Sequence, residues 1–126
     1  MNAAHSDGAI AVQAETLYLI NLMVAPGLAF LGLLWLARRH GRSPSPLVRC
    51  HLRQTIAASL WAGTLLLAVT LMIATLGSIN SPATWMVLIL YFTCVHSTLI
   101  LFGVFGLVRA MAGQLYVYPL IGARKW

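Results

Sequence analysis

The chain has 126 residues, of which 60% are hydrophobic and only 8% charged, and its formal net charge is +6. An average soluble domain has roughly 25% charged residues, and a soluble protein of this length could not bury so much apolar surface. We therefore predict one membrane-embedded domain over residues 1–126. The positive charge does not indicate nucleic-acid binding, because the basic residues stand at the ends of apolar runs, where membrane proteins place them.

Three apolar stretches are long enough to cross a membrane: residues 16–37, 55–76 and 82–108. None of them contains Lys, Arg, Asp or Glu. A bilayer core about 30 Å thick needs a helix of roughly 20 apolar residues, and a spanning segment must satisfy its backbone hydrogen bonds internally. The sequence therefore predicts an all-α integral membrane protein with three transmembrane helices. Pro26 should kink the first of them.

The basic residues indicate the orientation of these spans. They follow the first span at Arg38, Arg39, Arg42, Arg49 and Arg53, and the third at Arg109, Arg124 and Lys125. Residues 1–15 and 77–81 contain no Lys or Arg. The positive-inside rule then places the first loop and the C-terminus in the cytoplasm, and the N-terminus and second loop outside. We expect these basic side chains to contact anionic lipid headgroups of a bacterial cytoplasmic (inner) membrane, and residues 1–15 to form a mobile periplasmic tail.

One face of the second span carries small residues at helical spacing. Small side chains let membrane helices approach closely. The predicted packing residues are Thr55, Ala58, Ser59, Ala62 and Gly63 on this span, with His96 and Gly103 on the third. We predict a compact bundle with the second and third spans closely apposed. The sequence leaves open whether these faces meet within the chain or meet the helices of a partner subunit.

His96 lies near the middle of the third span, and an ionisable residue at that depth suggests a function. It could be a neutral structural histidine, part of a site shared with a partner, or a haem, metal or proton-relay group. His51 lies about 20 Å of helix rise from the middle of the second span, so it cannot share a metal ion with His96. Cys94 points to nearly the opposite side of the helix from His96. No metal or other cofactor is therefore predicted within the chain.

Catalytic groups also lack their partners in this sequence. The two acidic residues, Asp7 and Glu15, both precede the first span, so no buried carboxylate is expected. Ser97 stands next to His96 without a third group to orient a catalytic base, and no glycine-rich phosphate loop is present. The sequence thus predicts a protein that is not an enzyme.

Residues 109–126 differ in character from the spans. Gly113 should end the third helix. Aromatic residues then alternate with apolar ones at Tyr116 and Tyr118, and basic residues with Trp126 follow. This mixture is typical of the membrane–water interface. We expect an amphipathic interfacial tail that lies along the inner leaflet or covers a neighbouring subunit.

Two short motifs resemble a known family. The first is "HLRQTI", with His51 and Gln54, and the second is "AMAGQLYVYPL", with Gly113, Tyr116, Tyr118 and Pro119. They are similar to motifs of small bacterial membrane proteins related to the twenty-kilodalton channel subunit of the chloroplast inner-envelope translocon. Pro26 and Ala110 also match, whereas the family tends to carry an Asn, an aromatic residue and a Gln where this chain has Ala57, Ala58 and Ser59. The resemblance implies the membrane fold, and it favours translocation slightly.

We therefore expect a non-enzymatic membrane protein that packs by helix–helix contacts as an accessory or assembly subunit of a larger complex. Its predicted partners are membrane lipids and other membrane subunits. An oligomeric transport or protein-translocation component is the alternative. A redox subunit in which His96 ligates a cofactor shared with a partner is a third possibility.

Overall fold

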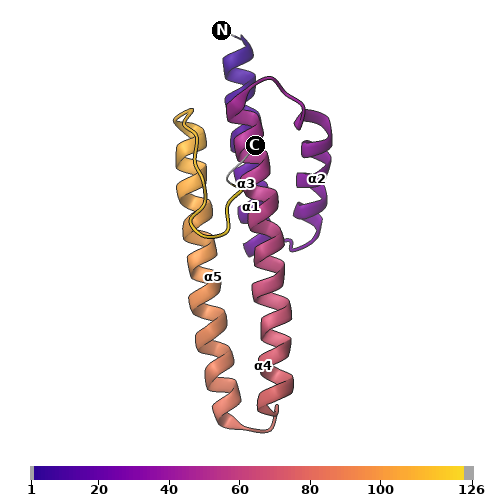
Figure 1. The fold of residues 1–126 in the computed structure, drawn as a ribbon, viewed down its shortest axis with the longest axis vertical. Helices are drawn as coiled ribbons and strands as arrows, with labels where there is room; N and C mark the ends of the chain where they lie inside the picture. Colours follow the sequence, from indigo (N-terminus) through magenta and orange to yellow (C-terminus); the bar gives the residue numbers. More distant parts are fainter. Residues whose placement is uncertain (1, 124–126) are drawn as a thin grey trace.

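The computed structural model describes residues 2–123, and the chain is all-helical over this range (Figure 1). The helices are α1 (Asn2–Met23), α2 (Leu28–His40), α3 (Pro46–Gly63), the π-helix η1 (Thr64–Ala68), α4 (Val69–Gly77) and α5 (Pro82–Met111). α3, η1 and α4 follow one another without a break and form one helix of 32 residues, Pro46–Gly77.

Proline fixes the starts of both long helices. Pro46 and Pro82 are the first residues of α3 and α5, where the missing N–H costs nothing and the fixed φ suits a helix. The start of α5 at Pro82 is that of the predicted third span. α5 ends at Met111, and Gly113 follows with a φ of +68°, a left-handed conformation that glycine adopts without strain.

The prediction of one helix over residues 16–37 is wrong. α1 ends at Met23, and α2 starts at Leu28 and runs antiparallel to it (Figure 1). Pro26 has no N–H to continue the helix, and Gly27 has a φ of +89° that reverses the chain. The side chain of Asn21 accepts a hydrogen bond from the Gly27 N–H at 2.9 Å. Pro26 therefore lies in a turn and does not kink a continuous span.

Two helices in residues 2–123 are long and apolar enough to cross a membrane: Pro46–Gly77, with 32 residues, and Pro82–Met111, with 30. At about 1.5 Å per residue they are roughly 48 and 45 Å long, which exceeds the hydrocarbon thickness. The expected count of three spans is not confirmed, because the first is a helical hairpin.

The start of α1 lies at the same end of the bundle as the loop of residues 41–45 and the end of α5 (Figure 1). The positive-inside rule predicts the opposite end for it. This difference follows from the hairpin, which returns the chain to the end where it began. Residues 2–15, expected as a mobile tail, form most of α1, and Ala11 and Ala14 are fully buried within it.

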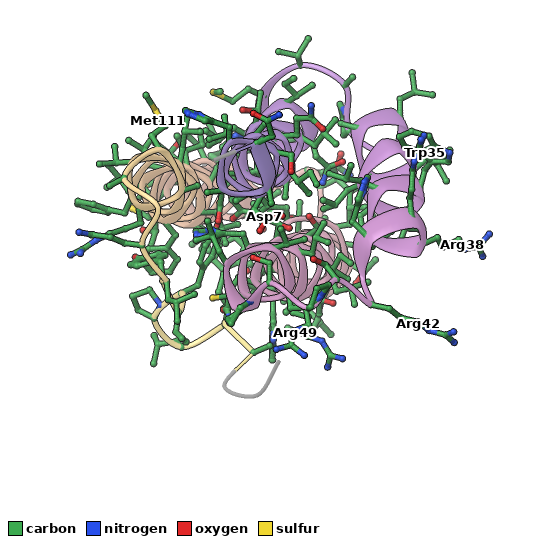
Figure 2. The ribbon with its side chains drawn as sticks, turned by 90° about the horizontal axis from the view of Figure 1, so that it is seen from above. Asp7, Trp35, Arg38, Arg42, Arg49 and Met111 are labelled. Carbon is green, nitrogen blue, oxygen red and sulfur yellow. The ribbon has the colours of Figure 1, made fainter. Side chains whose placement is uncertain are left out.

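α1 packs against α2, α3 and α5. These four helices surround the core at the end of the molecule that carries the loop of residues 41–45 and the arginines around it, the basic end (Figure 2). One core cluster comprises Tyr18, Leu19, Leu22, Ala58, Ala62, Leu99, Tyr118 and Ile121. A second comprises Ala14, Leu33, Leu36, Val48 and Leu52. α1 thus supplies residues to both core clusters, Tyr18, Leu19 and Leu22 to the first and Ala14 to the second.

The bundle is thinner at the end opposite the basic end, where the loop of residues 78–81 lies. Beyond the α1–α2 turn, only the α4 segment and the first half of α5 continue (Figure 1). η1 and α4 contain no buried residue. Apolar side chains such as Leu67, Leu71 and Leu76 are exposed along this part, so it has nothing within the described chain to pack against except α5.

Candidate functional site

The most polar part of the interior is a cluster around the Glu15 carboxyl group. Glu15 and His51 are both fully buried, and Nδ1 of His51 lies 2.6 Å from Oε1 of Glu15. The Tyr118 hydroxyl donates a hydrogen bond to Oε2 of Glu15. α1, α3 and the segment after α5 each contribute one of these side chains, so the cluster joins three parts of the chain. The expectation that no carboxylate is buried was therefore wrong.

The backbone around His51 determines where its protons lie. Nε2 of His51 is 2.9 Å from the carbonyl oxygen of Gln114, and a carbonyl only accepts, so Nε2 carries a hydrogen. One further proton must then lie between Nδ1 and Oε1 of Glu15. Whichever atom holds it, the pair has no net charge, which reduces the cost of its burial.

Burial raises the pKa of Glu15 above its ordinary value, and the hydrogen bonds from His51 and Tyr118 oppose this effect. Burial also raises the pKa of Tyr118, and the neighbouring Glu15 carboxyl raises it further. The phenol therefore keeps its proton and remains a donor to Glu15.

The residues after α5 fold back beside α3 and α5 (Figure 1). Gln54 bridges this segment twice: its carbonyl oxygen accepts from the Tyr118 N–H at 3.3 Å, and its amide donates to the Ala123 carbonyl. The Cys50 thiol donates to the Tyr116 carbonyl at 3.4 Å. Tyr118 is 1% exposed and packs edge-on against Tyr18, with ring centroids 5.4 Å apart.

Residues 112–123 are therefore packed against the helices, with Tyr118 and Ile121 in the core, whereas Leu120 is 99% exposed. The motif residues His51, Gln54 and Tyr118 all point into this contact. Pro119 is exposed beside them, and Tyr116 is half-buried. The two short motifs are thus the two sides of one intramolecular interface.

The predicted packing residues have different environments. Thr55, Ala58, Ser59 and Ala62 are buried, whereas Gly63 is exposed. The Thr55 hydroxyl donates to its own helix, at His51 O, 2.7 Å away. Gly103 faces α1: a Cβ added there would lie 2.5 Å from a Leu19 methyl and 2.7 Å from the Tyr18 ring. The close helix approach on α5 is therefore with α1 and not with the small face of α3.

The arginines lie around the basic end, with Arg38, Arg42 and Arg49 pointing outward in the view from above (Figure 2). Arg38, Arg39, Arg42, Arg53 and Arg109 are exposed, and Arg49 is half-buried. Arg39 stacks over the Trp35 ring at 5.4 Å, and Arg109 donates to the Gln114 side chain at 2.6 Å. Arg124 and Lys125 lie outside the described residues. The described arginines thus remain available to a charged surface.

His96 is half-buried on α5 and stacks at a tilt on Phe92, with ring centroids 5.2 Å apart. It lies away from the Glu15 cluster and borders a cavity beneath the α1–α2 turn. Within residues 2–123, no group of three His, Cys, Asp or Glu side chains is arranged to hold a metal ion. His96 thus borders the same cavity as Ser59, Ala62 and Gly63, whereas Gly103 faces α1.

Sequence reasoning missed Glu15 because it was assigned to a mobile tail. The signal was present: Ala11, Ala14, Tyr18 and Leu22 form a helical stripe with Glu15 in its middle. A carboxyl group within such a stripe must find buried donors. His51 and Tyr118, already singled out by the motifs, are those donors.

The fold and the cluster define a small, all-helical, membrane-associated protein with two long apolar helices and an internally paired polar core. Residues 9–124 match the model of the magnetosome magnetite crystal formation protein family, MamF/MmsF, and the chain belongs to this family. Searches of curated proteins and of solved structures each found no match. Membership in a small bacterial membrane family agrees with the expectation from the motifs, but nothing supports the similarity to the chloroplast translocon subunit.

Proposed function

We propose that this protein is a non-enzymatic accessory or assembly subunit of a bacterial membrane complex, and that the membrane is one in which magnetite crystals form. The family's description, magnetosome magnetite crystal formation, supports the proposed membrane. The proposed role as a subunit rests on the exposed apolar half of the molecule, where η1 and α4 bury no residue. That surface is available to lipid and to the helices of other subunits.

The Glu15 cluster supports a structural role over a catalytic one. Each carboxyl oxygen of Glu15 has a partner, and both ring nitrogens of His51 are engaged. A catalytic acid or base needs access to a substrate proton, but Glu15 and His51 are 0% exposed. The cluster instead fixes α1 and the segment after α5 to α3.

The proposed topology places the two long helices across the membrane and the α1–α2 hairpin at their basic end. Arg38, Arg42 and Arg109 would then lie at the cytoplasmic surface by the positive-inside rule. Because the hairpin returns to its starting end, the N-terminus would also be cytoplasmic. Anionic lipid headgroups are the proposed partners of the exposed arginines.

A photo-crosslinking residue placed at Leu71 tests the subunit role in the native membrane. Leu71 is exposed on α4, and Ser43, in the basic loop, provides the control position. We expect Leu71 to capture one defined membrane protein, and mild detergent to release a heteromeric assembly. A protein that crosslinks only to lipid and is extracted as a single 13.7 kDa chain would contradict the proposal. A conducting homo-oligomer would favour the transport alternative instead.

The proposed link to crystal formation has its own test. The gene is expressed in a magnetite-forming bacterium that lacks its own family member, and crystal size is measured by electron microscopy. We expect the chain to restore crystal size. Normal membrane insertion without any change in the crystals would contradict the proposal that the protein works in the membrane where magnetite forms.

A further inference from the structure

A cavity of about 770 Å³ lies where the α1–α2 turn meets the long helices. Its walls come from the α1–α2 turn, α3, η1 and α5, and they are largely apolar. Four side chains with hydrogen-bonding groups line it: Asn21, Ser59, Thr64 and His96. Asn21 accepts from the Gly27 N–H and Thr64 donates to the Leu60 carbonyl. Ser59 on α3 and His96 on α5, in contrast, have groups without such partners in the part of the chain that the structure describes. Its volume is within the range of about 300–1,000 Å³ that is usual for small-molecule sites.

The two polar groups have no partner in the described chain. Ser59 is 5% exposed, and its Oγ makes no hydrogen bond within residues 2–123; the same holds for Nδ1 of His96. A buried hydroxyl without a hydrogen-bond partner destabilises the folded state. The buried hydroxyl of Thr55, one turn before Ser59, bonds to its own helix instead. Ser59 and His96 therefore offer unused hydrogen-bonding capacity inside an apolar space.

The backbone is also irregular at this place. η1 lines the cavity through Thr64, Leu66 and Leu67, and the Val69 N–H bonds to the Thr64 carbonyl in the wider π-helical pattern. Single π-helical turns inside α-helices occur frequently at functional sites. The helix is therefore distorted beside the two unpartnered polar groups.

From these features we propose that the cavity binds a neutral, lipid-soluble compound with a ring carbonyl or phenol group, of the isoprenoid quinone type. No Lys, Arg, Asp or Glu lines the cavity, which favours an uncharged ligand. One quinone carbonyl accepts from the Ser59 hydroxyl and the other from an N–H of His96, and in the reduced quinol a phenol can donate to the same histidine. The Phe92 ring beside His96 offers an aromatic surface. This inference does not depend on the proposed accessory function.

Depth distinguishes this ligand from an ordinary phospholipid. Ser59 is six residues beyond Arg53, and His96 thirteen residues before Arg109, so the two lie about 9 and 20 Å deeper than these arginines along their helices. Phospholipid ester groups stay near the headgroups at the level of the arginines. A quinone ring can enter the hydrocarbon region and reach both side chains.

The experiment measures binding of decylubiquinone to the full-length protein in nanodiscs, by the rise in unfolding temperature with ligand concentration. Decylbenzene has the tail and the ring without the carbonyls. It tests whether an apolar molecule that fills the cavity binds equally well. We expect saturable binding of the quinone and at least tenfold weaker binding of decylbenzene. Equal binding of the two compounds, or no binding of the quinone, would overturn the proposal.

Ser59→Ala and His96→Leu test the assigned contacts, and each should weaken quinone binding at least tenfold. Ser97→Ala removes an exposed hydroxyl next to His96 and should leave binding unchanged. The unfolding temperature without ligand shows that each variant is folded, and a photoreactive quinone analogue should label the peptides containing Ser59 or His96. Unchanged affinity in both folded cavity variants, or labelling elsewhere, would mean that the cavity holds only acyl chains.

Discussion

Glu15 and His51 lie 36 positions apart in the sequence, yet Nδ1 of His51 is 2.6 Å from Oε1 of Glu15 and neither side chain is exposed. This contact joins α1 to α3. With the Tyr118 hydroxyl on the other carboxyl oxygen, it also joins both helices to the segment after α5. The buried pair is therefore the point at which the hairpin, the long helix and the returning chain meet.

Replacing Glu15 should destabilise the protein. Glu15→Leu removes both carboxyl oxygens, so that Nδ1 of His51 and the Tyr118 hydroxyl are left buried without a partner, at an expected cost of about 1–3 kcal/mol. Thermal unfolding in detergent measures the change. Asp7→Asn, which removes the other acidic charge of the chain, is the matched control and should leave the unfolding temperature unchanged. Equal stability of the two variants would show that the pair does not hold the fold together.

The hydrogen bond from Tyr118 to Glu15 should control how tightly residues 112–123 are held. In Tyr118→Phe this bond is lost, and the segment should open more often. Cys50, which is fully buried and bonds to the Tyr116 carbonyl, reports the opening through its rate of alkylation when Cys94 is replaced by Ser. We expect faster alkylation in Tyr118→Phe. Tyr116→Phe removes a phenol outside the Glu15 contact and should leave the rate unchanged; equal rates in the two variants would contradict the role of Tyr118.

Gly103 should tolerate no side chain. A Cβ at Gly103 would lie 2.5 Å from Leu19, so Gly103→Ala forces α1 and α5 apart, and overpacking of this kind costs about 1–3 kcal/mol. At Gly63 nothing lies within 4 Å of the same added atom. Gly63→Ala should therefore unfold at the same or a higher temperature. A stable Gly103→Ala protein would show that α1 does not pack tightly against α5.

The exposed arginines should bind anionic lipid through their charge. Arg38→Gln with Arg42→Gln removes two side chains that point outward (Figure 2), and each basic group near an anionic surface contributes about 1 kcal/mol. Native mass spectrometry after extraction counts the anionic lipids retained. Fewer should remain on the double Gln variant, whereas Arg38→Lys with Arg42→Lys should retain them. Equal retention by the Gln and Lys variants would contradict the electrostatic contact.

Composition and apolar run length were sufficient to predict an all-helical, membrane-associated chain and the start of α5 at Pro82. They could not predict the hairpin, because residues 16–37 are apolar throughout. The turn depends on Pro26 and Gly27, and a proline inside an apolar helix can either kink it or end it. The left-handed backbone of Gly27 decided the outcome.

The cluster around Glu15 was predicted only in part, because apolar run length does not reveal contacts between distant residues. The motifs identified His51, Gln54 and Tyr118, but not the group that connects them. Glu15 was placed in a tail because no Lys or Arg precedes it and the first span was expected to begin at residue 16. Its burial depends on contacts with residues far away in the sequence, and apolar run length carries no information on such contacts.

The placement of the two chain ends tests the proposed membrane arrangement most directly. Paired reporters, one active in the cytoplasm and one outside it, are fused in turn to the N-terminus, to the loop at residues 78–81 and to the C-terminus. We expect both termini in the cytoplasm and the loop outside, because the α1–α2 hairpin returns to the end where it starts. A cytoplasmic C-terminus with an external N-terminus would show that residues 16–37 cross the membrane as a single helix, and would contradict the hairpin arrangement.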